Sequence, residues 1–485
     1  MALLFAFPAP NGILSQASFG KTSTLRLESF NSPSRILHRF HRHPEDQMAD
    51  SLTISTATSN RLGSARAPQE IWELAIEHLA DDKKALNACS QVCRRFSPRS
   101  QALLFAHWDP RDETEVRTIL NVRRLADLVR ASPHVAAYIR QFWVFLGPPD
   151  DPTAITRYPD GAMPLITQLL PNLPNIHTIH LLSLSPDGAV DWKEDHAVSN
   201  GPKAALLAAF QHVATFERVT VKALRNFDLA FVSAASHIRR LELRSVLVTR
   251  EPLTFLNQES SSFDPNPRRK CVVESLMYYF ATGRCPERFV NYCLDHPDST
   301  LELGELKSLS LRDPTDSTGA NPISRLLRFC APALVNLTLG YNSNIAAGAE
   351  LPNLLPLERL AALRLDLSLA YYSNASHEER CNQAIQIVRS LPVDSQVRSI
   401  TLIFHAENRY LMMHEAEVRI HDWRTFDDAL FSAQTLLPHL DRFDVIYKYR
   451  NVGLTPGRFS ENFKEEDFPH CRSLEISVSR RFEFL

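Results

Sequence analysis

Three short segments decide the fold: LKSLSL at residues 306–311, LVNLTL at 334–339 and LAALRL at 360–365. Each has an apolar residue, written U, at its first, fourth and sixth positions, so the pattern is U-x-x-U-x-U. Apolar and polar residues alternating in this way are typical of a short strand with one buried face. If the second and third U point into a core, the residue between them points to the opposite face of the sheet.

The same pattern recurs at seven further places along the chain. Most of the intervals between motifs contain a helical pattern, such as MPLITQLL at 163–170 and ISRLLRFC at 323–330. A strand plus a helix per unit is the arrangement of leucine-rich repeats, and these units resemble degenerate members of that class. The further motifs are IRQFWV (139–144), IHTIHL (176–181), FERVTV (216–221), IRRLEL (238–243), VRSITL (397–402), LDRFDV (440–445) and CRSLEI (471–476).

The expected fold class is α/β: a short three-helix module, then an irregular leucine-rich-repeat-like solenoid with a parallel sheet over residues 135–485. A TIM-like barrel uses the same strand–helix alternation. Irregular motif spacing, and the lack of acidic or His residues clustered at strand ends, argue against the barrel. The remaining expected segments are a disordered extension at 1–63, the helical module at 64–107, a helical linker at 108–134, and an insertion at 250–300 with one or two helices over 272–295.

The residues between the second and third U define a candidate surface for binding a target protein. A Trp among charged side chains is the usual composition of an interaction surface. The row is Trp143, His180, Thr220, Glu242, Ser310, Thr338, Arg364, Thr401, Asp444 and Glu475, and it continues through Lys222, Arg244, Arg312 and Asp366.

Residues 64–107 carry three consecutive helical patterns. The first begins at Pro68, which suits the first position of a helix, and Asp81 and Asp82 can cap the second. Ser97 can cap the third. The first two patterns have apolar faces wider than one stripe. Three short helices cannot bury such faces among themselves, so the surplus must meet another part of the chain or another protein.

The stretch PQEIWELAIEHLADDKKALNACSQVCRRFSPRSQALLF (68–105) resembles an F-box of the kind common in mushroom-type fungi. The P-x-E-[IL]-W opening, the D-D-x-x-[AT]-L-x-x-C-x-x-V-C-[RK] centre and the P-R-S…L-F close match in order and spacing. The resemblance implies binding to the Skp-type adaptor of a cullin–RING ubiquitin ligase. The adaptor-binding residues that it implies are Pro68, Ile71, Ile76, Leu79, Leu86, Cys89, Val92, Cys93 and Phe96.

Composition and motifs exclude several other functions. The formal net charge is −2, which does not favour a general nucleic-acid binder. No phosphate-binding glycine loop or recognised catalytic motif occurs, so we expect no enzymatic activity and no cofactor. The spacing of Cys271, Cys285, Cys293 and His296 fits no standard zinc site, and no metal is expected. No apolar run is long enough to span a membrane.

The sequence therefore predicts a substrate receptor that recruits a ligase through the F-box and holds an unknown target protein on the repeat region, in the cytoplasm, the nucleus or both. The alternative is a repeat scaffold or inhibitor outside any ligase, with 64–107 as its N-terminal cap. A cap would bury Ile76, Leu79 and Val92 against the repeats. An F-box would leave part of that apolar set open in the isolated chain.

Overall fold

The computed structural model describes residues 68–484, and residues 66–485 belong to one compact unit. The predicted extension at 1–63 lies outside the described residues. The other segments outside them are 112–113, 147–156, 158–160, 184–189, 194–199, 250–269, 280–285, 296–298, 300, 313–321, 342–351, 370–376, 393, 408–426, 429–436 and 451–476.

Within the described residues, a 13-stranded sheet forms the body of the unit, and all of its strand pairs are parallel. The main path runs β1-β2-β5-β7-β8-β10-β11-β12-β13-β14-β15, so the order in space follows the order in the chain. These strands are β1 (Gln141–Leu146), β2 (Thr178–Ser183), β5 (Arg218–Lys222), β7 (His237–Arg244), β8 (Cys271–Tyr279), β10 (Ser308–Arg312), β11 (Asn336–Tyr341), β12 (Ala362–Leu369), β13 (Ser399–Glu407), β14 (Arg442–Arg450) and β15 (Ser477–Phe484).

The described residues form four further short strands. Two of them extend the main sheet: β4 (Thr215–Phe216) pairs with β7, and β9 (Leu301–Glu302) pairs with β8. The other two, β3 (Val190–Asp191) and β6 (Leu224–Arg225), pair with each other in a small second sheet.

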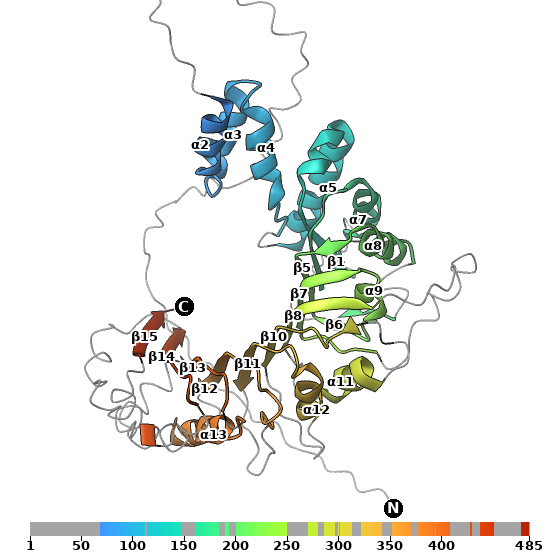
Figure 1. The fold of residues 1–485 in the computed structure, drawn as a ribbon. Helices are drawn as coiled ribbons and strands as arrows, with labels where there is room; N and C mark the ends of the chain where they lie inside the picture. The colour runs from blue at the N-terminus through green and yellow to red at the C-terminus, as the bar shows by residue number, and fades with distance from the viewer. Residues whose placement is uncertain are drawn as a thin grey trace, which may run out of the picture. The chain divides into compact units, whose positions relative to one another are not determined.

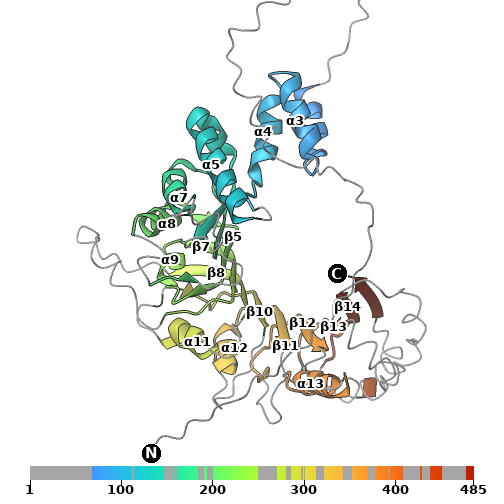
Figure 2. The same ribbon diagram turned by 180° about the vertical axis from the view of Figure 1, so that it is seen from behind.

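The helices fall into two groups. Helices α2 (Gln69–Glu77), α3 (Lys83–Val92) and α4 (Ser97–Ala106) form the predicted N-terminal helical module. The others cover one face of the sheet (Figures 1 and 2). They are α5 (Glu115–Ala131), α7 (Met163–Leu169), α8 (Asn200–His212), α9 (Ala230–Ser233), α11 (Pro286–Asp295), α12 (Pro322–Cys330) and α13 (His377–Arg389), with short 3-10 turns η2 (Pro133–Tyr138) and η3 (Leu170–Asn172).

The core lies between this helical layer and the sheet. The second and third U of each described motif project into it, as Leu309 and Leu311 do on β10, and both are fully buried. The first U is also buried, as at Leu306 and Leu334. Parallel sheets are usually covered on both faces. None of the described helices covers the second face of this sheet. That face must therefore be compatible with water, and it carries polar residues that water can solvate.

The expectation of a solenoid is wrong, although the parallel α/β arrangement is confirmed. A solenoid stacks copies of one unit, whereas here the crossovers differ in kind. β1 and β2 are joined through α7 and η3, β5 and β7 through a short strand and the four-residue α9, and β12 and β13 through the longer α13. The barrel alternative also fails, because the path ends at β1 and β15 without closing.

Two details of the predicted strands and helices need correction. Residues 271–279 form strand β8 rather than a helix, although α11 confirms a helix in the second half of 272–295. The segment VESLMY (273–278) fits the repeated motif once Tyr278 counts as its third apolar residue, and Val273, Leu276 and Tyr278 are buried. β8 therefore supplies the strand missing from the long interval.

The second detail is the register of the last strand. β15 pairs through residues that follow the CRSLEI motif, so Ser479, not Glu475, lies opposite Asp444. The shift is four residues, an even number, so the polar side of the strand stays on the same face. The motif itself, with Glu475, lies outside the described residues.

Candidate functional site

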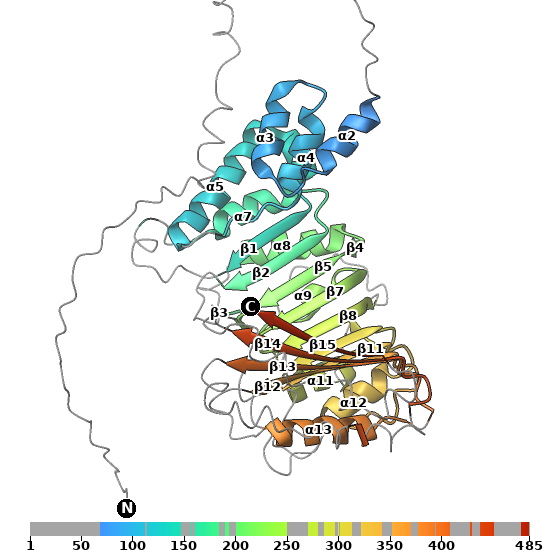
Figure 3. The same ribbon diagram turned by 90° about the vertical axis from the view of Figure 1, so that its left-hand side faces the viewer.

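The uncovered face of the sheet carries the predicted target-binding residues in two adjacent rows. Cross-strand pairing aligns Trp143, His180, Thr220, Glu242, Met277, Ser310, Thr338, Arg364, Thr401, Asp444 and Ser479 in the first row. The second row lies two residues further along each strand and aligns Lys222, Arg244, Tyr279, Arg312, Gly340 and Asp366. Figure 3 shows the strands that carry these rows side by side.

Glu242 is the centre of a cluster of three arginines. Its carboxylate lies 2.7 Å from Arg240 Nε, 2.9 Å from Arg244 Nη2 and 3.4 Å from Arg218 Nε. The Glu242 side chain is only 4% exposed, and a carboxylate this buried requires ionic partners. One negative charge among three positive ones leaves this part of the face cationic.

Asp366 is the second buried carboxylate of the face. Arg364 Nε lies 2.8 Å from its Oδ1, and Arg312 Nη2 lies 3.3 Å from its Oδ2. Burial alone would raise the pKa of Asp366. His405, whose Nε2 lies 3.9 Å away, and the two arginines outweigh burial and lower that pKa to about 2.

Gly340 is what allows Arg312 to reach Asp366. These two residues lie on β10 and β12, and Gly340 occupies the paired position on β11 between them. A Cβ atom at Gly340 would lie 2.9 Å from Arg312 Cγ and 3.5 Å from Asp366 Cβ. The first of these distances is shorter than carbon atoms tolerate, so any larger residue would displace the Arg312 side chain.

Trp143 and His180 form the aromatic end of the first row. Their rings are stacked with centroids 4.0 Å apart, and the guanidinium carbon of Arg111 lies 3.8 Å from the Trp143 centroid. Both side chains are buried. Burial, followed by the charge of Arg218, lowers the pKa of His180 to about 4, despite opposing effects of Glu242 and Asp109.

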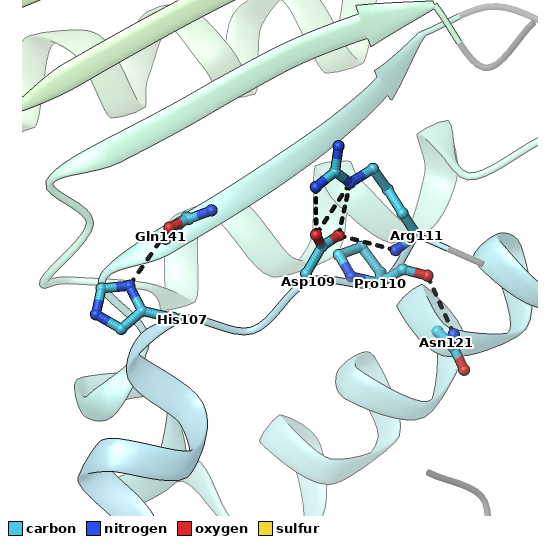
Figure 4. Close-up of polar contacts among 6 residues, drawn as sticks. All are labelled: His107, Asp109, Pro110, Arg111, Asn121 and Gln141. Carbon is cyan, nitrogen blue, oxygen red and sulfur yellow. Dashed lines mark hydrogen bonds and ion pairs between the residues drawn. The ribbon is translucent and has the colours of Figure 1, made fainter. Parts of the chain in front are cut away.

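The segment between α4 and α5 holds Arg111 over Trp143. Figure 4 shows Asp109 bound to the Arg111 side chain, with Arg111 Nε 2.9 Å from Asp109 Oδ1. The Arg111 backbone N–H donates to the same oxygen at 3.0 Å, and Asn121 of α5 donates to the carbonyl of Pro110 at 3.0 Å. These contacts fix the chain that connects the helical module to the sheet.

Sequence reasoning found part of this face and missed part of it. All eight predicted target-binding residues lie on it: Trp143, His180, Glu242, Arg244, Arg312, Arg364, Asp366 and Asp444. Asp444 pairs with Arg442 at 2.6 Å and accepts a hydrogen bond from Ser479. The residues that were missed are Arg111, Arg218, Arg240, Tyr279, Gly340 and His405. Arg240 contacts Glu242 within β7, and the others make their contacts from neighbouring strands or from the segment before α5. The strand motif gives no signal for these contacts.

The helical module is the second candidate site. Ile76 and Leu86 are buried within it and offer no free surface to a partner. Ile71 is 53% exposed, Leu74 53% and Val92 70%, so part of its apolar set is open in the isolated chain. Of the other predicted adaptor-binding residues, Pro68 and Cys93 are exposed, and Leu79, Cys89 and Phe96 are half-buried.

Local contacts cap and connect the helices of the module. Asp82 caps α3 by accepting from the backbone N–H groups of Lys84 and Ala85, as expected. Pro68 and Ser97 do not take their expected positions: Pro68 precedes α2, and Ser97 is the first residue of α4. Trp72 of α2 packs on Phe96 with ring centroids 5.4 Å apart, which ties α2 to the start of α4.

In the part of the chain that the structure describes, no three His, Cys, Asp or Glu side chains gather in a way that could hold a metal. Cys285 and His296 lie outside that part. The thiols of Cys271, Cys293, Cys330 and Cys381 are buried, and burial raises the pKa of Cys271 to about 12. Among the described helices, none has the length and apolar character needed to cross a membrane.

Comparison with known proteins adds no family to this picture. No protein-family model matches the chain, and no curated protein matches it. The resemblances to F-boxes and to leucine-rich repeats therefore rest on the motifs described above, and they stay predictions.

Proposed function

We propose that this chain is the substrate-receptor subunit of a Skp–cullin–F-box ubiquitin ligase. The helical module binds the Skp-type adaptor, and the uncovered sheet face binds a target protein. The chain itself catalyses nothing. It acts by raising the effective concentration of target lysines near the ubiquitin-charged partner.

The observation that carries this proposal is the open apolar surface of the helical module. Ile71 and Leu74 lie three residues apart on one side of α2, and Val92 lies at the end of α3. Burying one such side chain fully contributes roughly 1.5–3 kcal/mol. A domain that exposes three of them has apolar surface to offer a partner. A mere cap on the sheet would have buried Val92.

The module also has the rigidity that a docking surface needs. Ile76 and Leu86 form its small core, and Arg99 of α4 makes an ion pair with Glu77 of α2. Its link to the sheet runs through α4, where Ala106 accepts a hydrogen bond from the backbone N–H of Arg140 at 3.4 Å. Adaptor and target would thus be held on one connected framework.

Co-purification with a fungal Skp-type adaptor tests the proposal. The wild-type chain is expected to form a stable complex, and the double variant Ile71→Asp, Val92→Asp is expected to lose it. Leu355→Asp is the matched control, because Leu355 is 55% exposed but lies outside the module. It should bind the adaptor as the wild type does.

Two results would contradict the proposal. The first is a well-behaved wild-type chain that forms no complex, which favours a scaffold or inhibitor outside any ligase. The second is a Leu355→Asp variant that loses binding as fully as the double variant does. The complex would then depend on nonspecific apolar contacts and not on the helical module.

A further inference from the structure

The uncovered sheet face carries more positive than negative charge over its central strands. We call this region the arginine strip and define it by six cations and two carboxylates, a net charge of +4. Its members are Arg218, Lys222, Arg240, Glu242, Arg244, Arg312, Arg364 and Asp366. The whole chain has a net charge of −2, so the strip is a local concentration of positive charge.

Two arginines of the strip lie beside the same aromatic ring. The guanidinium carbon of Arg312 lies 4.6 Å from the Tyr279 ring centroid, and that of Arg244 lies 5.4 Å from it. Their strands are the two neighbours of β8, so the arginines flank Tyr279 from both sides. The two guanidinium carbons are at most about 10 Å apart, the sum of these distances. Two like charges this close favour an anion between them.

We propose that the arginine strip binds an acidic segment of a partner protein, rich in Asp and Glu, with a carboxylate between Arg244 and Arg312 above Tyr279. The inference rests on the proposed function, because the segment belongs to the target protein. It deepens that proposal by naming the chemistry of the target.

The arginines of the strip are already arranged to hold carboxylates. Arg244 gives Nη2 to Glu242, and Arg312 gives Nη2 to Asp366. A guanidinium carries five N–H donors in a planar fork that matches a carboxylate. The Arg244 side chain is 45% exposed and the Arg312 side chain is 28% exposed, so solvent reaches both. A further carboxylate can therefore bind without breaking the internal ion pairs.

The dimensions of the strip suit an extended peptide. It reaches from β5 to β12, which is five strand spacings along the sheet, or about 24 Å. An extended chain advances about 3.3 Å per residue, so about seven residues would span it. Nucleic acid fits the strip less well. Domains that bind nucleic acid are usually strongly basic, and those that bind single strands expose several aromatic rings on which bases stack. The sequence pI here is about 6.8.

Fluorescence anisotropy of the full chain with a labelled Glu-Gly-Ser repeat peptide tests the proposal. The wild type should bind this peptide, should lose affinity as salt is added, and should not bind the same peptide with Gln in place of Glu. Arg244→Gln, Arg312→Gln should weaken binding about tenfold or more, because both groups contact the same carboxylate. The matched control Arg328→Gln, Arg389→Gln removes two exposed helix arginines and should bind as the wild type does.

Three results would overturn the proposal: wild-type binding that is equal for the Glu and Gln peptides, unchanged affinity in the Arg244→Gln, Arg312→Gln variant, or tighter binding of a single-stranded oligonucleotide of the same charge. The comparison of the two peptides uses the wild type alone, so it decides the question even if the double variant fails to fold. Adaptor co-purification with the same samples separates the two proposals. Peptide binding can fail while the adaptor complex persists, and the reverse can also occur.

Discussion

Trp143 and His180 lie directly opposite each other on β1 and β2, and their rings stack with centroids 4.0 Å apart. The Arg111 guanidinium lies over the Trp143 ring, and the charges of Arg218 on β5 and Glu242 on β7 act on His180. A proton on His180 would create a buried cation in a stack that already carries the Arg111 guanidinium on its Trp143 side. This arrangement makes the aromatic end of the face sensitive to acid.

We expect His180 to lower the stability of the fold as the pH falls from about 6.5 to about 4. The folded pKa of about 4 lies below the ordinary value of 6.5, so only the unfolded chain binds the proton within this window. A shift of this size corresponds to about 3 kcal/mol at most. Urea unfolding at pH 7 and pH 5 should show a smaller loss of stability in His180→Gln than in the wild type. His212→Gln, at an exposed position on α8, should behave like the wild type. Parallel losses in all three chains would contradict the assignment.

Asp366 also makes the fold less stable in acid, but over a lower range of pH than His180 does. Its pKa of about 2 lies below the ordinary value of 3.8, so its stabilising contribution is complete above about pH 4 and disappears as the pH falls towards 2. The contribution is of the order of 2 kcal/mol. Asp366→Asn should therefore destabilise the chain at pH 7 by about that amount and flatten its acid unfolding curve below pH 4. An Asn variant as stable as the wild type at pH 7 would show that the ion pairs contribute nothing net.

Gly340→Ala should break the contact between Arg312 and Asp366 without removing a charge. The new Cβ would displace Arg312 at its Cγ, and overpacking of this kind costs roughly 1–3 kcal/mol. Thermal unfolding measures the effect. Gly201→Ala is the control, because a Cβ there meets only Thr167 at an ordinary 3.9 Å. It should be neutral or slightly stabilising. Equal behaviour of the two variants would mean that Arg312 moves aside at no cost.

The register of the uncovered face could be predicted because it depends only on a period of two. Once the second and third U of each motif are buried, the residue between them must face the other way, as Glu242 and Arg364 do. β8 was missed for a local reason. Its third motif position is Tyr278, which is buried and donates its hydroxyl to the carbonyl of Val246 at 2.9 Å. A motif whose apolar positions do not admit tyrosine does not recognise a polar-tipped ring in that role.

The ionic contacts between different strands could not be predicted, because they depend on spatial neighbours that are far apart in the sequence. Contacts such as Arg364 with Asp366 join residues only two apart on one strand. Arg312 and Asp366 are separated by 54 residues and meet only because Gly340 leaves room between their strands. In the helical module, the helical pattern indicated which faces of the helices are apolar. Which of them become buried depends on how α4 packs, and so Ile76 is covered while Ile71 stays open.

That difference leads to a prediction about the folded state of the helical module. Ile76→Asp would place an unpaired charge in the small core and should destabilise the module by at least about 3 kcal/mol. Val92→Asp changes a side chain that is already in water, so its effect should lie within about 0.5 kcal/mol. Hydrogen exchange of the α2–α4 amides in the isolated chain measures both effects. Loss of protection in Val92→Asp would show that Val92 is covered in solution, and the module would then be a cap on the sheet rather than a free adaptor-binding surface.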